Sequence, residues 1–498
     1  MFARSGPPMV AALLGLTLSA SALAQQAPAP VPSPTATPAA QQPGAPVTFA
    51  PQIAPIELPL PTLTSEQAAQ LRQLIAQGRI AQGLRYSSVE AEKLPADDTA
   101  LVRTALDYAR ALHIGRLDPS DFQEDWALRP AAWDPLPGFS KAVAENRIAQ
   151  WFANLTPPYA GYETLRQGLA RYRLIAAAGG WSTLAAGPDL SVGSSGARVA
   201  ALRKRLAVED DTTPAGGDSF DAALKEAVVR AQRRYGLAPT GVVSKGTLAA
   251  LNVPVEQRVR QIMANMERWR WMPQTMPTDR IQVNIAAAQV AVFEGDTPVM
   301  SMRGVTGRPG GGETPMLSSM IHSVVLNPPW NVPAGIAQRE LFPKGAAYLA
   351  ANGFKVIGTG PGRRLQQQPS HSALGKYKFD FANPFAVYLH DTPSKGTFSR
   401  YDRLASHGCI RLERPGDLAR LLLEGSAQWT PEAIDAAIAK GDTVRADLPS
   451  DVAVYLLYWT AYGSSSGAMN FRDDPYGWDK TLATKIENRS AAQAVAAR

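Results

Sequence analysis

Cys409 is the only cysteine in the 498-residue chain, and its neighbours are suited to chemistry. The stretch ASHGCIRL places His407 two residues before the thiol and Gly408 directly before it. A histidine within hydrogen-bond range can take the thiol proton and later protonate a leaving amine. Glycine lets the backbone approach a ligand, so that nearby N–H groups can face a developing oxyanion. This combination predicts acyl transfer through a thioester.

A second histidine, His390, ends the apolar run AVYLH, and fifteen residues separate it from Ser406. This length suits a loop that leaves one strand and returns to the sheet beside it. We therefore expect His390 and Cys409 to face each other across two adjacent strand ends.

Two alternatives compete with catalysis at these residues. Most lone cysteines are buried as small hydrophobic residues. His390, His407 and Cys409 could also bind zinc, but His-x-Cys is close spacing for two ligands, and no Asp/Glu-rich motif accompanies them. We therefore expect no metal at these residues.

The elements that must position this site follow from the hydrophobic period. The segment ALVRTALDYARALH repeats apolar residues at helical spacing, whereas RIQVNI alternates as a strand does. With the Pro- and Gly-rich boundaries, these patterns predict a multidomain α+β chain. The expected parts are a signal peptide at 1–24, a Pro/Ala-rich disordered linker at 25–61, an all-α scaffold domain at 62–186, a small three-helix unit at 187–255, a connecting helix at 256–278, a β-rich domain at 279–480 and a charged tail at 481–498.

An insertion interrupts the β-rich domain at residues 331–378, with helical character followed by the polar stretch GTGPGRRLQQQP. A segment of this length is more often a lid or a binding loop than a neutral excursion. It leaves the sheet beside NPPWNVP and returns before the strand that ends in His390. We therefore expect it to form a cap over the Cys409 site.

The N-terminus predicts export. Arg4 precedes an uncharged, mostly apolar run that ends in the cleavage pattern Ala22-Leu23-Ala24. An uncleaved inner-membrane anchor is the alternative. The net charge of +7 is dispersed, without a basic run or an aromatic-basic array, which argues against nucleic-acid binding.

Two known families are similar to these segments. Residues 187–255, with the runs QRRYGL and TGV, resemble three-helix peptidoglycan-binding domains. The pattern H-x15-SHGCIR resembles the signature of L,D-transpeptidases, whose catalytic domain has the YkuD-type fold. The helical region and the long insertion resemble the large scaffolded Gram-negative members. This resemblance implies a periplasmic location.

The resemblance also implies residue roles. Cys409 would be the nucleophile, and His390 the general base, oriented through a backbone carbonyl near Asp391. The N–H groups of His407, Gly408 and Cys409 would form the oxyanion hole. Arg411 would bind a substrate carboxylate, with a structural ion pair as an equally weighted alternative. The residues expected to contact substrate are Ser406, Arg411, Tyr388, Trp330 and Asn331.

The implied reaction uses peptidoglycan stem peptides and requires no cofactor. The thiol would attack the bond after the third residue of a tetrapeptide stem, and the acyl group would pass to a second stem, giving cross-links between third-position diaminopimelate residues. Carbapenem-type β-lactams are the expected covalent inhibitors, and other cell-wall synthesis enzymes are candidate partners. The alternatives are an L,D-carboxypeptidase, an enzyme that attaches a lipoprotein to peptidoglycan, and a non-catalytic wall-binding protein.

Overall fold

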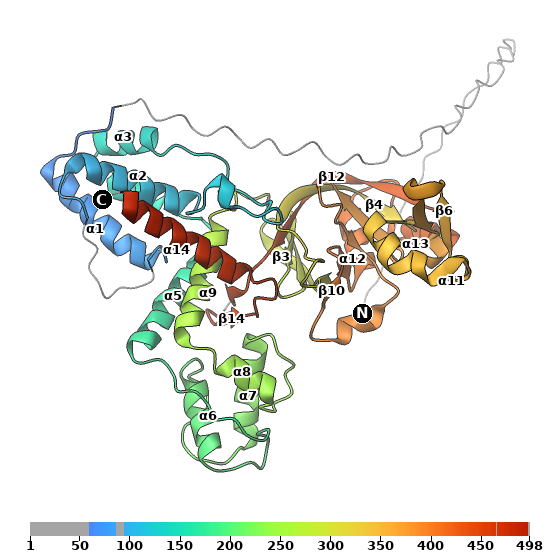
Figure 1. Cartoon of the computed structure of the whole chain (residues 1–498), viewed down its shortest axis with the longest axis horizontal. Coiled ribbons are helices and arrows are strands. Elements are labelled where there is room, and N and C mark those ends of the chain that lie inside the picture. Colours follow the sequence, from blue (N-terminus) through green and yellow to red (C-terminus); the bar gives the residue numbers. More distant parts are fainter. Residues whose placement is uncertain (1–58, 86–93, 465, 497–498) are drawn as a thin grey trace, which may run out of the picture. The chain divides into compact units, whose positions relative to one another are not determined.

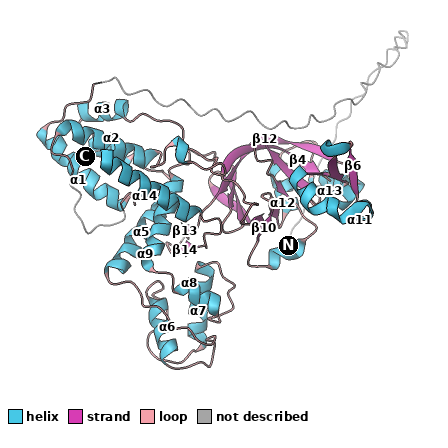
Figure 2. Ribbon diagram, in the orientation of Figure 1, coloured by secondary structure: helices cyan, strands magenta, loops and turns pink. Residues whose placement is uncertain are grey.

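The computed structural model describes residues 59–85, 94–464 and 466–496 (Figure 1). The predicted signal peptide and nearly all of the predicted linker lie outside these residues. Within them the chain is helical at first and β-rich later, which confirms the predicted multidomain α+β class (Figure 2). No helix in the described ranges is long and apolar enough to cross a membrane.

The scaffold region folds as helices, as predicted. Thr64 caps the first helix and forms a capping box with Gln67. Apolar residues of the first four helices, such as Leu71, Leu101 and Phe139, are fully buried in a shared core. The helices are α1 (Ser65–Ala81), α2 (Asp98–His113), α3 (Leu136–Ala144), α4 (Ile148–Ala153) and α5 (Ala160–Ala177).

The small three-helix unit comprises α6 (Ala197–Ala207), α7 (Ala222–Arg234) and α8 (Lys245–Leu251). Its core includes Val199, Leu224 and Val228, which are fully buried. The next helix, α9 (Val255–Trp269), occupies the first part of the predicted connecting helix at 256–278 and ends earlier than expected.

The catalytic sheet has nine strands in the order β10-β3-β11-β9-β8-β4-β12-β1-β2. β2 also pairs with β3, so the sheet curls and closes on itself. Helices α12 (Pro415–Leu422) and α13 (Pro431–Lys440) pack against it. The strands are β1 (Arg280–Asn284), β2 (Gln289–Glu294), β3 (Thr297–Gly307), β4 (Leu317–Leu326), β8 (Tyr377–Phe381), β9 (Leu389–His390), β10 (Leu404–Ser406), β11 (Ile410–Leu412) and β12 (Val444–Leu457).

The insertion is a small subdomain with its own apolar cluster around Leu341, Leu349 and Leu365. Strand β5 comes first, and helical turns with α11 (Gly345–Ala351) separate it from β6 and β7; the three strands form a sheet in the order β5-β7-β6. Its strands are β5 (Trp330–Val332), β6 (Phe354–Ile357) and β7 (Arg364–Gln367). The polar stretch, which showed no strand pattern in the sequence, supplies the turn and second strand of the β6–β7 hairpin.

The C-terminal segment differs from the expectation. The prediction of a charged tail at 481–498 is wrong for its described part, because residues Trp478–Ala496 form helix α14. Trp478, Leu482 and Ile486 recur every four residues and are buried, so this helix presents an apolar stripe. A short hairpin, β13 (Ala461–Gly463) with β14 (Met469–Phe471), precedes it.

A buried ion-pair cluster lies at the C-terminal end of α9. The Glu267 side chain is 0% exposed, and its Oε2 atom lies 3.1 Å from both Arg116 Nε and Arg270 Nη1. Gly115 has a φ of +87°, and a Cβ there would lie 2.4 Å from Glu267 Oε1, so the turn before Arg116 requires glycine. Burial opposes ionisation of Glu267, but the guanidinium groups of Arg116 and Arg270 more than offset it and hold the carboxyl pKa below its usual range.

We predict that Glu267→Gln destabilises the protein strongly. The buried guanidinium of Arg270 and the half-buried one of Arg116 would lose their carboxylate, a change that costs about 3–5 kcal/mol in buried pairs. Glu256→Gln is the matched control, because Glu256 lies exposed on the same helix and its loss should cost at most about 0.5 kcal/mol. Urea unfolding followed by tryptophan fluorescence measures both, and equal midpoints for the two variants would contradict the assignment.

Candidate active site

Strand pairing brings the predicted thiol and histidine together. β9 and β11 are parallel neighbours, with Leu389 opposite Ile410 and His390 opposite Arg411. The Ile410 N–H donates to the Tyr388 carbonyl at 3.0 Å, which sets Cys409 beside Tyr388. Since alternate residues of a strand share a face, Tyr388 and His390 point the same way, with ring centroids 5.5 Å apart.

The loop before the thiol is held in one shape by its own polar groups. Gly408 has a φ of +110°, a region that favours glycine, and a Cβ there would lie 3.2 Å from the Glu313 carbonyl oxygen. Thr314 Oγ1 donates to the Gly408 carbonyl at 2.7 Å. Ser406 Oγ accepts from the Gly408 N–H at 3.2 Å and donates to the Cys409 carbonyl at 2.6 Å.

These contacts correct two expectations. Ser406 was expected to contact substrate, but its side chain is buried inside the loop and both of its hydrogen bonds are internal. Gly408 was expected to supply one N–H of the oxyanion hole, but this N–H already donates to Ser406. The N–H groups of His407 and Cys409 have no backbone acceptor among the residues that the structure describes.

His390 is a buried, neutral imidazole. Its side chain is 5% exposed, and its Nδ1 atom is hydrogen-bonded to the carbonyl oxygen of Asp391. Burial, followed by the nearby charge of Arg411, lowers the pKa of His390 to about 3. A neutral ring that donates through Nδ1–H keeps a lone pair on Nε2, which can accept a proton.

The thiol is also neutral at rest. Burial raises the pKa of Cys409, although hydrogen bonds from Tyr388 and the charges of Lys378 and Arg411 act in the opposite direction. Burial raises the pKa of the Tyr388 hydroxyl, and the nearby Cys409 raises it further, whereas Trp330 acts in the opposite direction. Within the described ranges no hydrogen bond joins Cys409 Sγ to His390; the sulfur lies 4.0 Å from the Ala386 carbonyl oxygen.

Arg411 is a half-buried cation without a counterion. Its side chain has no ion pair or hydrogen bond to a residue of the described ranges, so the alternative of a structural ion pair finds no partner there. The charge of Arg411 lowers the pKa of both His390 and Cys409. A free guanidinium beside the thiol can bind a carboxylate in two-point geometry.

The insertion contacts the catalytic loop at two places. Trp330 reaches Tyr388, as described above, and its ring centroid lies 6.3 Å from that of Phe354. His407 Nε2 lies 2.8 Å from both Glu340 Oε1 of the insertion and Arg308 Nη1. His407 is therefore tied to the insertion rather than to the thiol.

Asn331, also expected to contact substrate, is exposed on β5, where its Oδ1 accepts from Gln366 Nε2 at 2.8 Å. Sequence reasoning did not find Arg308, Thr314 or Glu340. They lie about 70–100 residues before Cys409, and no local spacing connects them with it. The described residues contain no group of three His, Cys, Asp or Glu side chains that could hold a metal ion.

Comparisons with known families divide the chain into three matched parts. Residues 278–434 match the model described as "L,D-transpeptidase catalytic domain", residues 59–169 match "Scaffold domain", and residues 195–251 match "Putative peptidoglycan binding domain". The chain therefore contains an L,D-transpeptidase catalytic domain of the YkuD type, together with a scaffold domain and a peptidoglycan-binding domain.

A curated protein from Haemophilus influenzae, named "Putative L,D-transpeptidase", is 31% identical over 248 residues, which are 46% of this chain and 50% of that protein. This chain thus matches about half the length of its curated relative. A solved L,D-transpeptidase from Xylanimonas cellulosilytica is 16% identical, with a TM-score of 0.19 over 55% of this chain and 99% of that one. L,D-transpeptidase 3 from Mycobacterium tuberculosis, solved with a faropenem-derived adduct, is 15% identical, with a TM-score of 0.20. The match covers 36% of this chain and 60% of that one.

We predict that Cys409 alkylates slowly at neutral pH and faster as the pH rises. The thiolate is the reactive form, and both the raised thiol pKa and the neutral His390 keep its population low at pH 7. The rate of iodoacetamide labelling, followed by mass spectrometry, measures the reactivity of this single thiol directly. A rate that is already constant between pH 5 and 7, as a preformed thiolate–imidazolium pair would give, contradicts this prediction.

Tyr388→Phe should slow labelling at pH 8 by a few fold, because it removes a hydroxyl donor that favours the thiolate. Tyr401→Phe is the matched control, since Tyr401 is exposed and does not contact the thiol.

Proposed function

We propose that the chain is a cysteine-dependent L,D-transpeptidase that cross-links peptidoglycan stems through a thioester on Cys409. The observation that carries the proposal is the pairing of β9 with β11, which sets the thiol, a neutral histidine and an arginine without a counterion among the described residues side by side within a matched catalytic domain. The peptidoglycan-binding match supports the substrate class. The N-terminal segment supports export to the periplasm.

The proposed acylation begins with proton transfer. His390 Nε2 accepts the thiol proton while the sulfur attacks the carbonyl carbon of the bond after the third stem residue. Since thiol and imidazole are both neutral at rest, this transfer accompanies the attack. The developing oxyanion faces the N–H groups of His407 and Cys409. When the C–N bond breaks, His390 returns the proton to the leaving amine, and the thioester remains.

Deacylation runs the same steps with a new nucleophile. The side-chain amine of a second stem, which we propose to be that of diaminopimelate, attacks the thioester carbonyl, and His390 takes the excess proton from the amine. The C–S bond breaks, and the thiol regains a proton. Arg411 is placed to hold a stem carboxylate during both steps. Water as the acceptor would instead give a tripeptide, the product of a carboxypeptidase.

The same thiol would open the strained ring of a carbapenem-type β-lactam. The product would be a thioester to Cys409 that lacks a leaving amine, so we propose these compounds as covalent inhibitors. Attachment of a lipoprotein would require only a different acyl acceptor. Association with other cell-wall synthesis enzymes remains a proposal without a surface assigned to it.

We predict that Cys409→Ala abolishes turnover of disaccharide-tetrapeptides while the protein stays folded. Removal of a catalytic nucleophile lowers kcat by about 10⁴-fold or more. Mass analysis of the products separates the alternatives: dimers indicate transpeptidation, and tripeptides indicate carboxypeptidation. Cross-linking that persists in Cys409→Ala would overturn the proposed function.

His390→Ala should slow acylation by about 10²–10⁴-fold, the usual contribution of a general base. His322→Ala is the matched control, because His322 is exposed on β4, where its Nδ1 lies 2.7 Å from Asp451 Oδ1. If His407→Ala slows acylation more than His390→Ala does, the base is assigned to the wrong histidine.

The insertion is proposed to act as a cap that holds the donor stem and keeps water from the thioester. Glu340→Ala would break the contact between the insertion and His407. We expect the ratio of cross-linked product to tripeptide to fall several-fold, while acylation by a small carbapenem changes little. Replacement of residues 333–375 by a short linker should have a larger effect in the same direction.

Glu424→Ala is the matched control for this test, because Glu424 is exposed just after α12 and lies outside the insertion. A product ratio that is the same in Glu340→Ala, the trimmed chain and the wild type would show that the insertion is not a cap.

A further inference from the structure

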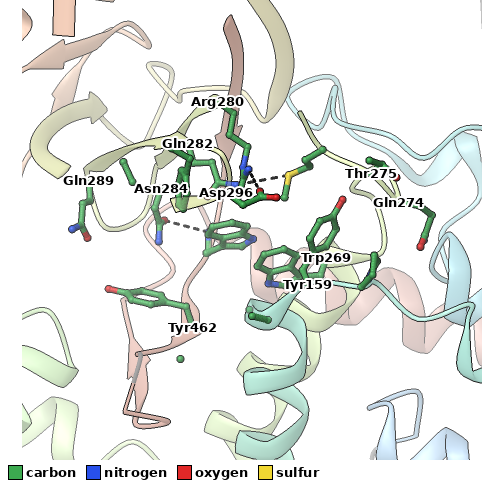
Figure 3. A pocket seen from close by; sticks show the side chains of 18 residues that line it. Tyr159, Trp269, Gln274, Thr275, Arg280, Gln282, Asn284, Gln289, Asp296 and Tyr462 are labelled. Carbon is green, nitrogen blue, oxygen red and sulfur yellow. Dashed lines mark hydrogen bonds and ion pairs between the residues drawn. The ribbon is translucent and has the colours of Figure 1, made fainter. Parts of the chain in front are cut away.

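Apart from the Cys409 site, the structure has a cavity lined by other residues (Figure 3). Its volume of about 630 Å³ lies within the range of about 300–1,000 Å³ that is usual for ligand pockets. The walls come from the start of α5, the segment after α9, strands β1 and β2, and the segment after β12.

Aromatic rings form one side of this cavity. Trp269 and Trp459 stack with centroids 4.6 Å apart and planes 14° apart, and Tyr159 lies 5.4 Å from Trp269. Gly161 permits this arrangement, because a Cβ there would lie 2.5 Å from Trp269 Cζ2. Trp459 and Tyr462 are only half-buried, so parts of their rings remain available to a ligand.

Side-chain amides form the other side. In the antiparallel β1–β2 pair, Asn284 lies opposite Gln289 and Gln282 lies opposite Ala291, so their side chains share one face of the sheet. Gln282 is 9% exposed, and its Nε2 atom meets only the weak acceptor Met276 Sδ at 3.8 Å. Within the described ranges, the Nδ2 of Asn284 and the amide of Gln289 have no hydrogen-bond partner. Gln282 is buried, Asn284 is half-buried and Gln289 is exposed, so the three amides give the cavity a polar wall that runs from its interior to its mouth and is open to a ligand.

The cavity offers no free charge. Arg280 is the cation in its wall, and its guanidinium donates to the carbonyl oxygens of Pro277 and Thr278 and is paired with Asp296. It also lies over the Phe293 ring, 4.4 Å from the centroid. Among the described lining residues, the positive charge of Arg280 already has a counterion in Asp296. A ligand with a carboxylate or a phosphate would therefore find no free cation there, which disfavours a stem peptide.

We propose that this cavity binds an uncharged glycan of N-acetylated amino sugars. The C–H faces of a pyranose ring carry small positive charge and suit the negative faces of Trp and Tyr rings. Hydroxyl and acetamido groups can both donate and accept, as the amides of Gln282, Asn284 and Gln289 do. The ligand would be the sugar chain of peptidoglycan, and to that extent the inference rests on the proposed function. It would hold the glycan while Cys409 acts on a stem.

The test is calorimetric titration of the full chain with the β-1,4-linked tetramer of N-acetylglucosamine, which has no peptide and no carboxylate. Trp459→Ala and Gln289→Ala should each weaken the binding component of this cavity by about tenfold or more, the scale of one lost stacking or bidentate contact. Gln257→Ala is the matched control, because Gln257 is exposed on α9 outside the cavity. Glycan bound by residues 195–251 would appear as a component that neither variant changes.

Unaltered thermal unfolding and an unaltered rate of Cys409 alkylation establish that each variant is folded, and Gln289→Ala removes only an exposed side chain. The proposal is overturned if the wild type shows no binding of the tetramer at concentrations up to about 10 mM. It is also overturned if both variants bind as the wild type does, or if a sugar-free tetrapeptide competes for the site. Cys409→Ala should bind the tetramer normally, so the loss of transpeptidation and the loss of glycan binding are separate outcomes.

Discussion

The parallel pairing of β9 with β11 is the constraint on which the active site depends. These strands are only two and three residues long, but they lie between β8 and β3 within the nine-stranded sheet. Their register sets Cys409 beside Tyr388 and Arg411 beside His390. A shift of one residue would turn each side chain to the opposite face. The long strands on either side therefore fix the geometry of a site whose own strands are short.

Burial determines the protonation of this pair. His390 is kept neutral by desolvation, and the same effect raises the pKa of the thiol. Both neutral groups lie near the charge of Arg411, and in the proposed mechanism charge appears on them only during the reaction. Such a site avoids a standing thiolate, which is the form most easily oxidised or alkylated. Tyr388 acts on the pKa of the thiol, and Trp330 of the insertion acts on the pKa of Tyr388, so the insertion influences this protonation state.

Helix α9 is one element through which the scaffold helices contact the β-rich domain. Buried Glu267, Arg116 and Arg270 join this helix to the turn after α2, while α5 and α14 pack against its sides. Trp269 at the end of α9 stacks on Trp459, which follows the long strand β12. The proposed glycan cavity is built around this stack. In this proposal, glycan binding and the packing of α9 against the segment after β12 use the same aromatic side chains.

The sequence by itself determined the parts of the chain and pointed to Cys409 as the proposed nucleophile. Helical and strand periods located the scaffold helices, the three-helix unit and the β-rich domain, because each pattern is local. The motif around Cys409 identified the family for the same reason. Only the tertiary structure decided what each side chain meets. It buried Ser406 inside the loop, tied His407 to Glu340, left Arg411 unpaired and turned the expected tail into α14. Those outcomes depend on contacts between residues far apart in the chain, which no local spacing records.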